Sequence, residues 1–125
     1  MLQRLLDDHH GLRAIIAELR PHLHAAAQPI GMCLAASRWA LTFRLLRHIA
    51  VEGQYLRALG VIALDDVARG VSLAARFNAH LTRWSSTEID LRWDSYRTEL
   101  SAFLNEIEEE MLFEERHLFP SLKAA

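Results

Sequence analysis

Residues 88–118 read EIDLRWDSYRTELSAFLNEIEEEMLFEERHL, and apolar side chains recur in this stretch every three or four positions. This spacing predicts one long amphipathic α-helix with a single apolar face. The face consists of Trp93, Tyr96, Leu100, Phe103, Ile107, Glu110, Glu114 and His117. Near the end of the helix, carboxylates therefore occupy positions where Leu or Ile would normally pack.

Three earlier segments carry the same three-and-four spacing, and they predict helices over residues 2–20, 32–59 and 70–84. Pro21 is expected to end the first helix because it lacks the amide hydrogen that continuation needs. Gly60 is a suitable cap for the second helix. Residues 61–70 are interpreted as a connection, either irregular or a short helix capped by Asp65 or Asp66, and residues 85–87 as the cap of the last helix. The predicted fold is all-α, a single domain over residues 1–125 with an antiparallel up-down-up-down four-helix bundle.

Composition excludes several classes of protein. The 125 residues are 51% hydrophobic, so the chain can bury one core, and its formal net charge is −2. Acidic and basic residues are interspersed, which gives no basic face for nucleic acid. We expect no membrane span, no signal peptide and a cytoplasmic location. The single cysteine, Cys33, excludes an internal disulfide and leaves either a packing or a redox role open.

Each predicted helix directs His or Glu into its apolar face. Since a buried unpaired carboxylate costs several kcal/mol, a group of such residues needs a positive partner. Mixed imidazole and carboxylate donors suit a dinuclear iron or manganese centre, whereas a structural zinc ion takes fewer ligands. The predicted metal ligands are His9, His48, Glu52, His80, Glu110 and Glu114.

Position along the helix axis sets a second requirement, because ligands must lie at one level of the bundle. His9 is near the start of its helix, while Glu52 and Glu114 are near the ends of theirs, so an antiparallel bundle brings them to the same end. His80 reaches that level only if its helix starts near Gly70. A start at Ile62 would displace His80 by about 10 Å, at the rise of an α-helix.

The chain resembles the hemerythrin-like (HHE cation-binding) domains along nearly its whole length. The resemblance rests on DHHGL at 8–12, HIAVE at 48–52, His80, and EERHLFP at 114–120. It implies a four-helix bundle with a non-haem di-iron centre. In that family the residues matching Glu52 and Glu114 bridge the two irons, and those matching His9, His48 and His80 are terminal ligands.

One position departs from the family pattern, because Glu110 stands where members usually have His. The resemblance, with this departure, implies a centre that binds or senses oxygen, nitric oxide or redox state. A peroxidase-like or ferroxidase-like enzyme is an alternative, as is a metal-free bundle that acts as an interaction domain. Manganese or zinc could replace iron, and a protein partner or a homodimer is possible.

Other residues offer weaker alternatives. His10 could replace His9, although it lies beside the apolar face. Glu114 and His117 have the spacing of a ferritin-like ligand pair, but Tyr55 stands where the second helix would need His. Tyr55 is interpreted mainly as a core residue, with a hydrogen bond to a bound oxygen species as the alternative.

Overall fold

The structure, a computed structural model, describes residues 2–29, 33–57 and 60–124. Its elements are α1 (Leu2–Leu23), α2 (Cys33–Leu56), α3 (Val61–Arg83), α4 (Ser86–Leu91), α5 (Trp93–His117) and α6 (Phe119–Ala124). These described ranges contain no strand, which confirms the all-α prediction. No helix in them is long and apolar enough to cross a membrane.

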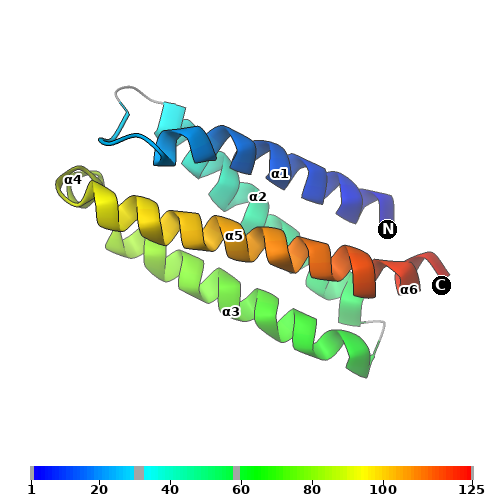
Figure 1. Ribbon diagram of the computed structural model, residues 1–125. Helices are drawn as coiled ribbons and strands as arrows, with labels where there is room; N and C mark the ends of the chain where they lie inside the picture. Colours follow the sequence, from blue (N-terminus) through cyan, green and yellow to red (C-terminus); the bar gives the residue numbers. More distant parts are fainter. Residues whose placement is uncertain (1, 30–32, 58–59, 125) are drawn as a thin grey trace.

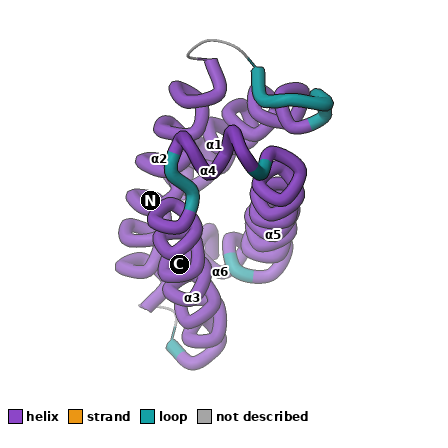
Figure 2. Tube along the Cα trace, turned by 90° about the vertical axis from the view of Figure 1, so that its left-hand side faces the viewer, coloured by secondary structure: helices purple, strands orange, loops and turns teal. Residues whose placement is uncertain are grey.

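The long helices α1, α2, α3 and α5 lie along one another, and successive ones run in opposite directions (Figure 1). Helix α1 packs against α2 and α5, and α2 packs against α3. The short helices α4 and α6 lie at opposite ends of α5, and both chain termini are at the α6 end (Figure 1). In the view turned by 90°, the described part of the chain is mostly helical, with loop segments next to the helix ends (Figure 2).

Two groups of buried apolar side chains form the core. The larger group joins the first five helices. The smaller group lies at the α6 end and consists of Leu5, Leu56, Ala63, Leu118, Phe119 and Leu122. On each long helix, a buried polar residue lies between the positions that belong to the larger apolar group and those that belong to the smaller one. These residues are His9, Glu52, Asp66 and Glu114. The apolar faces are therefore interrupted at one common level.

Helix α3 begins about nine residues before the predicted start. The interpretation of residues 61–70 as a connection is wrong, because the apolar face of α3 continues backward through Leu73 to Ala63. Gly60, with φ of 78°, makes the turn before α3. This backbone conformation is readily available only to glycine, so Gly60 determines where the chain reverses.

Three other boundaries differ from the prediction. Helix α1 continues past Pro21 to Leu23, because proline has a helical φ and its ring removes only one hydrogen bond from the last turn. The predicted last helix is divided into α4 and α5 at Arg92, whose φ of −132° and ψ of 49° are not helical. Beyond α5, α6 is a further short helix. The predicted end positions 32 and 59 of the second helix lie outside the described residues.

The predicted cap before the last helices is confirmed at Ser85. Its hydroxyl oxygen accepts a hydrogen bond from the backbone N–H of Glu88 at 3.2 Å, which satisfies a free donor of the first turn of α4.

Candidate metal centre

Four buried residues from three helices bring their donor atoms together at the α6 end of the molecule. They are His9 of α1, His48 and Glu52 of α2, and Glu114 of α5, whose donor atoms all lie within 4.8 Å of one another. Nε2 of His48 is 2.6 Å from Oε2 of Glu52, and Nε2 of His9 is 3.2 Å from Oε1 of Glu114. Imidazole and carboxylate donors thus converge on one point.

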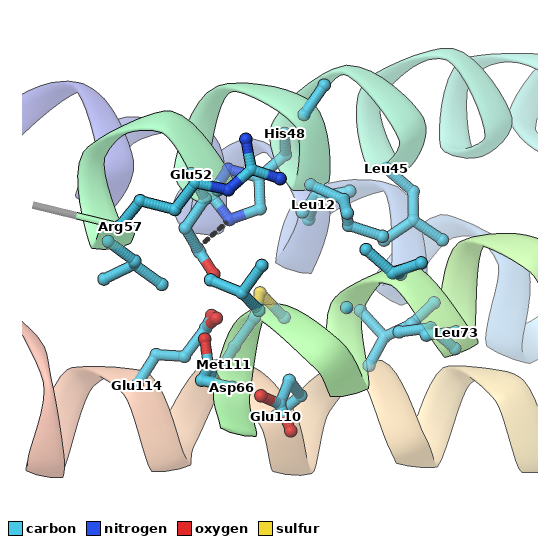
Figure 3. A pocket seen from close by; sticks show the side chains of 18 residues that line it. Leu12, Leu45, His48, Glu52, Arg57, Asp66, Leu73, Glu110, Met111 and Glu114 are labelled. Carbon is cyan, nitrogen blue, oxygen red and sulfur yellow. Dashed lines mark ion pairs between the residues drawn. The ribbon is translucent and has the colours of Figure 1, made fainter. Parts of the chain in front are cut away.

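A second group of possible ligands adjoins the first. It contains Asp66 of α3 together with Glu110 and Glu114 of α5, again with donor atoms within 4.8 Å of one another. Glu114 belongs to both groups. The carboxylates of Glu52, Asp66 and Glu114 point toward one another across a shared pocket (Figure 3). A carboxylate shared in this way is suited to bridge two cations.

The outward ring nitrogens of His9 and His48 are each held by a carboxylate. Nδ1 of His9 is 2.7 Å from Oε2 of Glu115, and Nδ1 of His48 is 3.0 Å from Oδ2 of Asp8. Because an ionised carboxylate only accepts, each Nδ1 donates its hydrogen, and in the neutral imidazole the lone pair of Nε2 then faces inward. Metal-binding histidines commonly have this outer partner, which fixes both the tautomer and the ring orientation.

The nitrogen and oxygen atoms that face the pocket do not satisfy one another's hydrogen-bonding capacity. The two Nε2 atoms are 3.1 Å apart, so they can form one hydrogen bond only if one ring carries an additional proton. Oε2 of Glu52 and Oε1 of Glu110 are buried without a hydrogen bond of acceptable geometry. These unpaired carboxylate oxygens lie on both sides of the pocket and are free to bind a cation.

The acidic residues around the pocket differ in proton affinity. Burial raises the pKa of Glu52, but the adjacent imidazoles of His48 and His9 outweigh this effect and lower the pKa overall. Burial, together with the adjacent carboxylate of Glu110 and its negative charge, raises the pKa of Asp66 to about 8. In the absence of a cation, Asp66 therefore holds a proton at neutral pH.

Arginines stabilise the outer edge of this arrangement. Arg13 pairs with Glu115 at 2.8 Å. Burial raises the pKa of Glu115, but the hydrogen bonds from Arg13 and His9 lower it overall. Arg69 lies 3.3 Å from both Asp66 and Glu110, with a half-exposed side chain. Since Arg69 lies at the surface, it leaves the interior of the pocket to the carboxylates.

The pocket is a cavity of about 120 Å³ between α2, α3 and α5. Apolar side chains, among them Leu12, Leu45, Leu73, Ile107 and Met111, form much of its wall, and Arg57 also lines it (Figure 3). This volume accommodates ions together with a small ligand of a few atoms.

His80 lies outside both groups of ligands, which corrects its predicted position. Because α3 starts at Val61, His80 is about 21 Å further along the helix axis than Asp66, at the rise of an α-helix. Its Nδ1 is 2.7 Å from Oε2 of Glu99, and its ring packs near Phe77 and Tyr96. Burial lowers the pKa of His80. The structure therefore brings five of the six predicted residues together, places Asp66 beside them, and places His80 elsewhere.

Sequence reasoning missed three residues of this centre. The sequence places Asp66 in the predicted connection, as a candidate helix cap, although the spacing of Ala63, Asp66 and Leu73 on one face indicates a buried position. Asp8 and Glu115, which orient the histidines, had no recognised signal beyond their position next to His9 and Glu114.

The alternative ligands remain outside both groups. His10 and His117 are exposed, and the His117 ring lies beside Phe113. Tyr55 packs against the smaller apolar group, as expected of a core residue. The side chain of Cys33 lies outside the described part of the chain.

Comparison of the chain with protein-family models, with curated proteins and with solved structures found no match. The candidate centre is therefore interpreted from its own geometry.

Proposed function

We propose that this chain is a hemerythrin-like, non-haem dinuclear metal protein, with iron as its metal. One ion would be held by His9, His48, Glu52 and Glu114, and the other by Asp66, Glu110 and Glu114. The observation that carries the proposal is the position of Glu114 in both groups. In this proposal, the four long helices act as an up-down-up-down bundle that holds the ligands at one level.

Charge balance supports two ions. The two groups contain four carboxylates, those of Glu52, Asp66, Glu110 and Glu114, and two divalent ions would neutralise them. Oxygen-rich donors with some imidazole suit iron or manganese better than a four-coordinate zinc site. The two places are unequal, because only the first includes histidines.

The metal-free alternative is less well supported. A bundle that used these residues only for internal pairing should satisfy its buried acceptors, whereas Oε2 of Glu52 and Oε1 of Glu110 have no hydrogen bond. The carboxylate donors of the second place favour an oxidised metal, which keeps a di-iron peroxidase-like or ferroxidase-like enzyme as the second candidate.

Bound iron would supply a redox-active centre for oxygen or nitric oxide. The chain's own contribution is to orient the ligands through Asp8 and Glu115 and to restrict water with the apolar cavity wall. The cavity size favours a ligand of a few atoms over an organic substrate. We therefore propose binding or sensing of a small molecule as the function.

Metal content per chain tests the proposal. Protein from iron-supplied cells, measured by mass spectrometry of its metals, is expected to hold about two irons per chain, as in dinuclear carboxylate proteins. Glu114→Gln should lose most of this metal because it weakens both places. Glu109→Gln is the matched control, since Glu109 is exposed on the same helix. Full metal retention in Glu114→Gln would refute the assignment.

A further inference from the structure

A second hollow lies on the outer side of His48, between α1 and α2. Its volume is about 360 Å³, and it is lined by Asp8, Ala40, Phe43, Arg44, Arg47 and His48. Five of these residues come from consecutive turns of α2, and Asp8 comes from α1. The hollow is separate from the metal pocket, although His48 lines both.

Two arginines in this hollow have no acidic partner. Neither Arg44 nor Arg47 forms an ion pair or a side-chain hydrogen bond within the described residues, whereas Arg13, Arg20 and Arg76 all do. Arg44 and Arg47 are three positions apart on one helix, so their positive charges repel each other. An anion between them would remove that repulsion and accept hydrogen bonds from both guanidinium groups.

The backbone of α1 makes room for one of these arginines. A Cβ atom at Gly11 would overlap the guanidinium group of Arg44. The absence of a side chain at Gly11 therefore allows Arg44 to lie against α1, at the edge of the hollow.

The remaining residues that line the hollow indicate which chemical group could be attached to the anion. Phe43 is 67% exposed, so its ring is an apolar surface open to a ligand. The Asp8 carboxylate accepts a hydrogen bond from His48 at 3.0 Å, which partly offsets its negative charge. The formal charge of the two arginines and Asp8 together is positive, and an aromatic surface adjoins it.

We propose that this hollow binds a phosphate monoester with an aromatic or apolar body. A phosphate monoester carries a charge of about −1.5 to −2 at neutral pH, which matches two guanidinium groups better than a single carboxylate does. Planar arginine groups recognise such oxyanions through paired hydrogen bonds. The apolar body would pack on Phe43, and the ligand would lie beside the Asp8–His48 pair.

Calorimetric titration of the full chain with phenyl phosphate, at constant ionic strength, tests this proposal. We expect one molecule bound per chain, with affinity reduced about tenfold or more in Arg44→Gln/Arg47→Gln because two charge-assisted contacts are lost. Arg4→Gln/Arg116→Gln removes the same formal charge from exposed arginines outside the hollow and should bind as the parent does. All four positions are exposed, and circular dichroism checks that each variant is folded.

Two further comparisons locate the ligand. Inorganic phosphate should bind several-fold more weakly than phenyl phosphate, and Phe43→Ala should remove that difference, because the apolar contact is lost. Gly11→Ala should weaken phenyl phosphate binding while retaining the helix, since alanine favours helix and displaces Arg44.

The outcomes distinguish this site from the metal centre. If phenyl phosphate bound the metal ions instead, Arg44→Gln/Arg47→Gln would bind it as tightly as the parent, and the proposal would be overturned. An equal loss of affinity for phenyl phosphate in Arg4→Gln/Arg116→Gln would show that the effect comes from the overall charge of the protein. That result would also overturn the proposal.

Discussion

At the scale of single residues, His9 and His48 of the candidate centre use their two ring nitrogens in different ways. Each Nδ1 donates to a carboxylate, of Glu115 or Asp8, and each Nε2 faces inward. Asp66 differs, because burial and the charge of Glu110 raise its pKa to about 8. A proton on Asp66 compensates for an absent cation, and metal binding would displace it.

Asp66 makes the stability of the metal-free protein depend on pH. The pKa of Asp66 is about 8 in the folded chain, compared with an ordinary value of 3.8, so the folded chain binds a proton that the unfolded chain has released between these values. The proton on Asp66 makes its full contribution to the free energy of unfolding below pH 3.8. This contribution is lost as the pH rises through about 8.

In Asp66→Asn, the decrease in the free energy of unfolding that this proton causes with rising pH should disappear. Urea unfolding of chelator-treated protein at pH 6 and pH 9 should show a smaller decrease in the free energy of unfolding for Asp66→Asn than for the parent. Asp65→Asn, at the exposed neighbouring position, should behave as the parent does. Identical pH dependence in parent and Asp66→Asn would contradict the raised pKa.

At the scale of helices, the position of a residue along the axis depends on where its helix begins. The sequence predicted most of the buried helical positions, because three-and-four spacing is a strong signal, but His117 of the predicted last face is exposed. It did not predict the start of α3, because Asp65, Asp66 and Gly70 resemble a connection when considered alone. That error of about nine residues corresponds to about 14 Å along the axis, and it interchanged His80 and Asp66 as candidate ligands.

His80 should therefore be dispensable for metal binding. His80→Ala is expected to keep the parent's metal content while its free energy of unfolding falls by about 2–4 kcal/mol, through loss of a buried ring and of the Glu99 hydrogen bond. His48→Ala should lose metal. Metal analysis and urea unfolding of both variants provide the check, and metal loss in His80→Ala would restore the original ligand set.

The turn between α2 and α3 should depend on Gly60. Because Gly60 has φ of 78°, Gly60→Ala should lower the free energy of unfolding by about 1–3 kcal/mol. Gly53→Ala is the contrasting control: no atom within 4 Å obstructs a Cβ in this helical position, so a gain of about 0.5–1 kcal/mol is expected. Thermal or urea unfolding measures both, and equal effects would contradict the assigned turn.

At the scale of the whole molecule, the antiparallel order of the long helices places the start of α1 and α3 beside the ends of α2 and α5. His9 and Asp66 thereby meet Glu52 and Glu114 between the two apolar groups (Figure 1). The sequence predicted this common level for His9, Glu52 and Glu114. It could not predict the carboxylate pairs that orient the histidines, because these contacts join residues distant in the chain, such as His9 and Glu115.

The most direct test of the dinuclear assignment is an anomalous difference map at the iron edge, from crystals of the iron-loaded chain. We predict two peaks about 3.5–4 Å apart, the separation of paired metal ions in proteins. One peak should lie beside Nε2 of His9 and His48, the other beside Asp66 and Glu110, with Glu114 between them. A single peak, or a peak beside His80, would contradict the account.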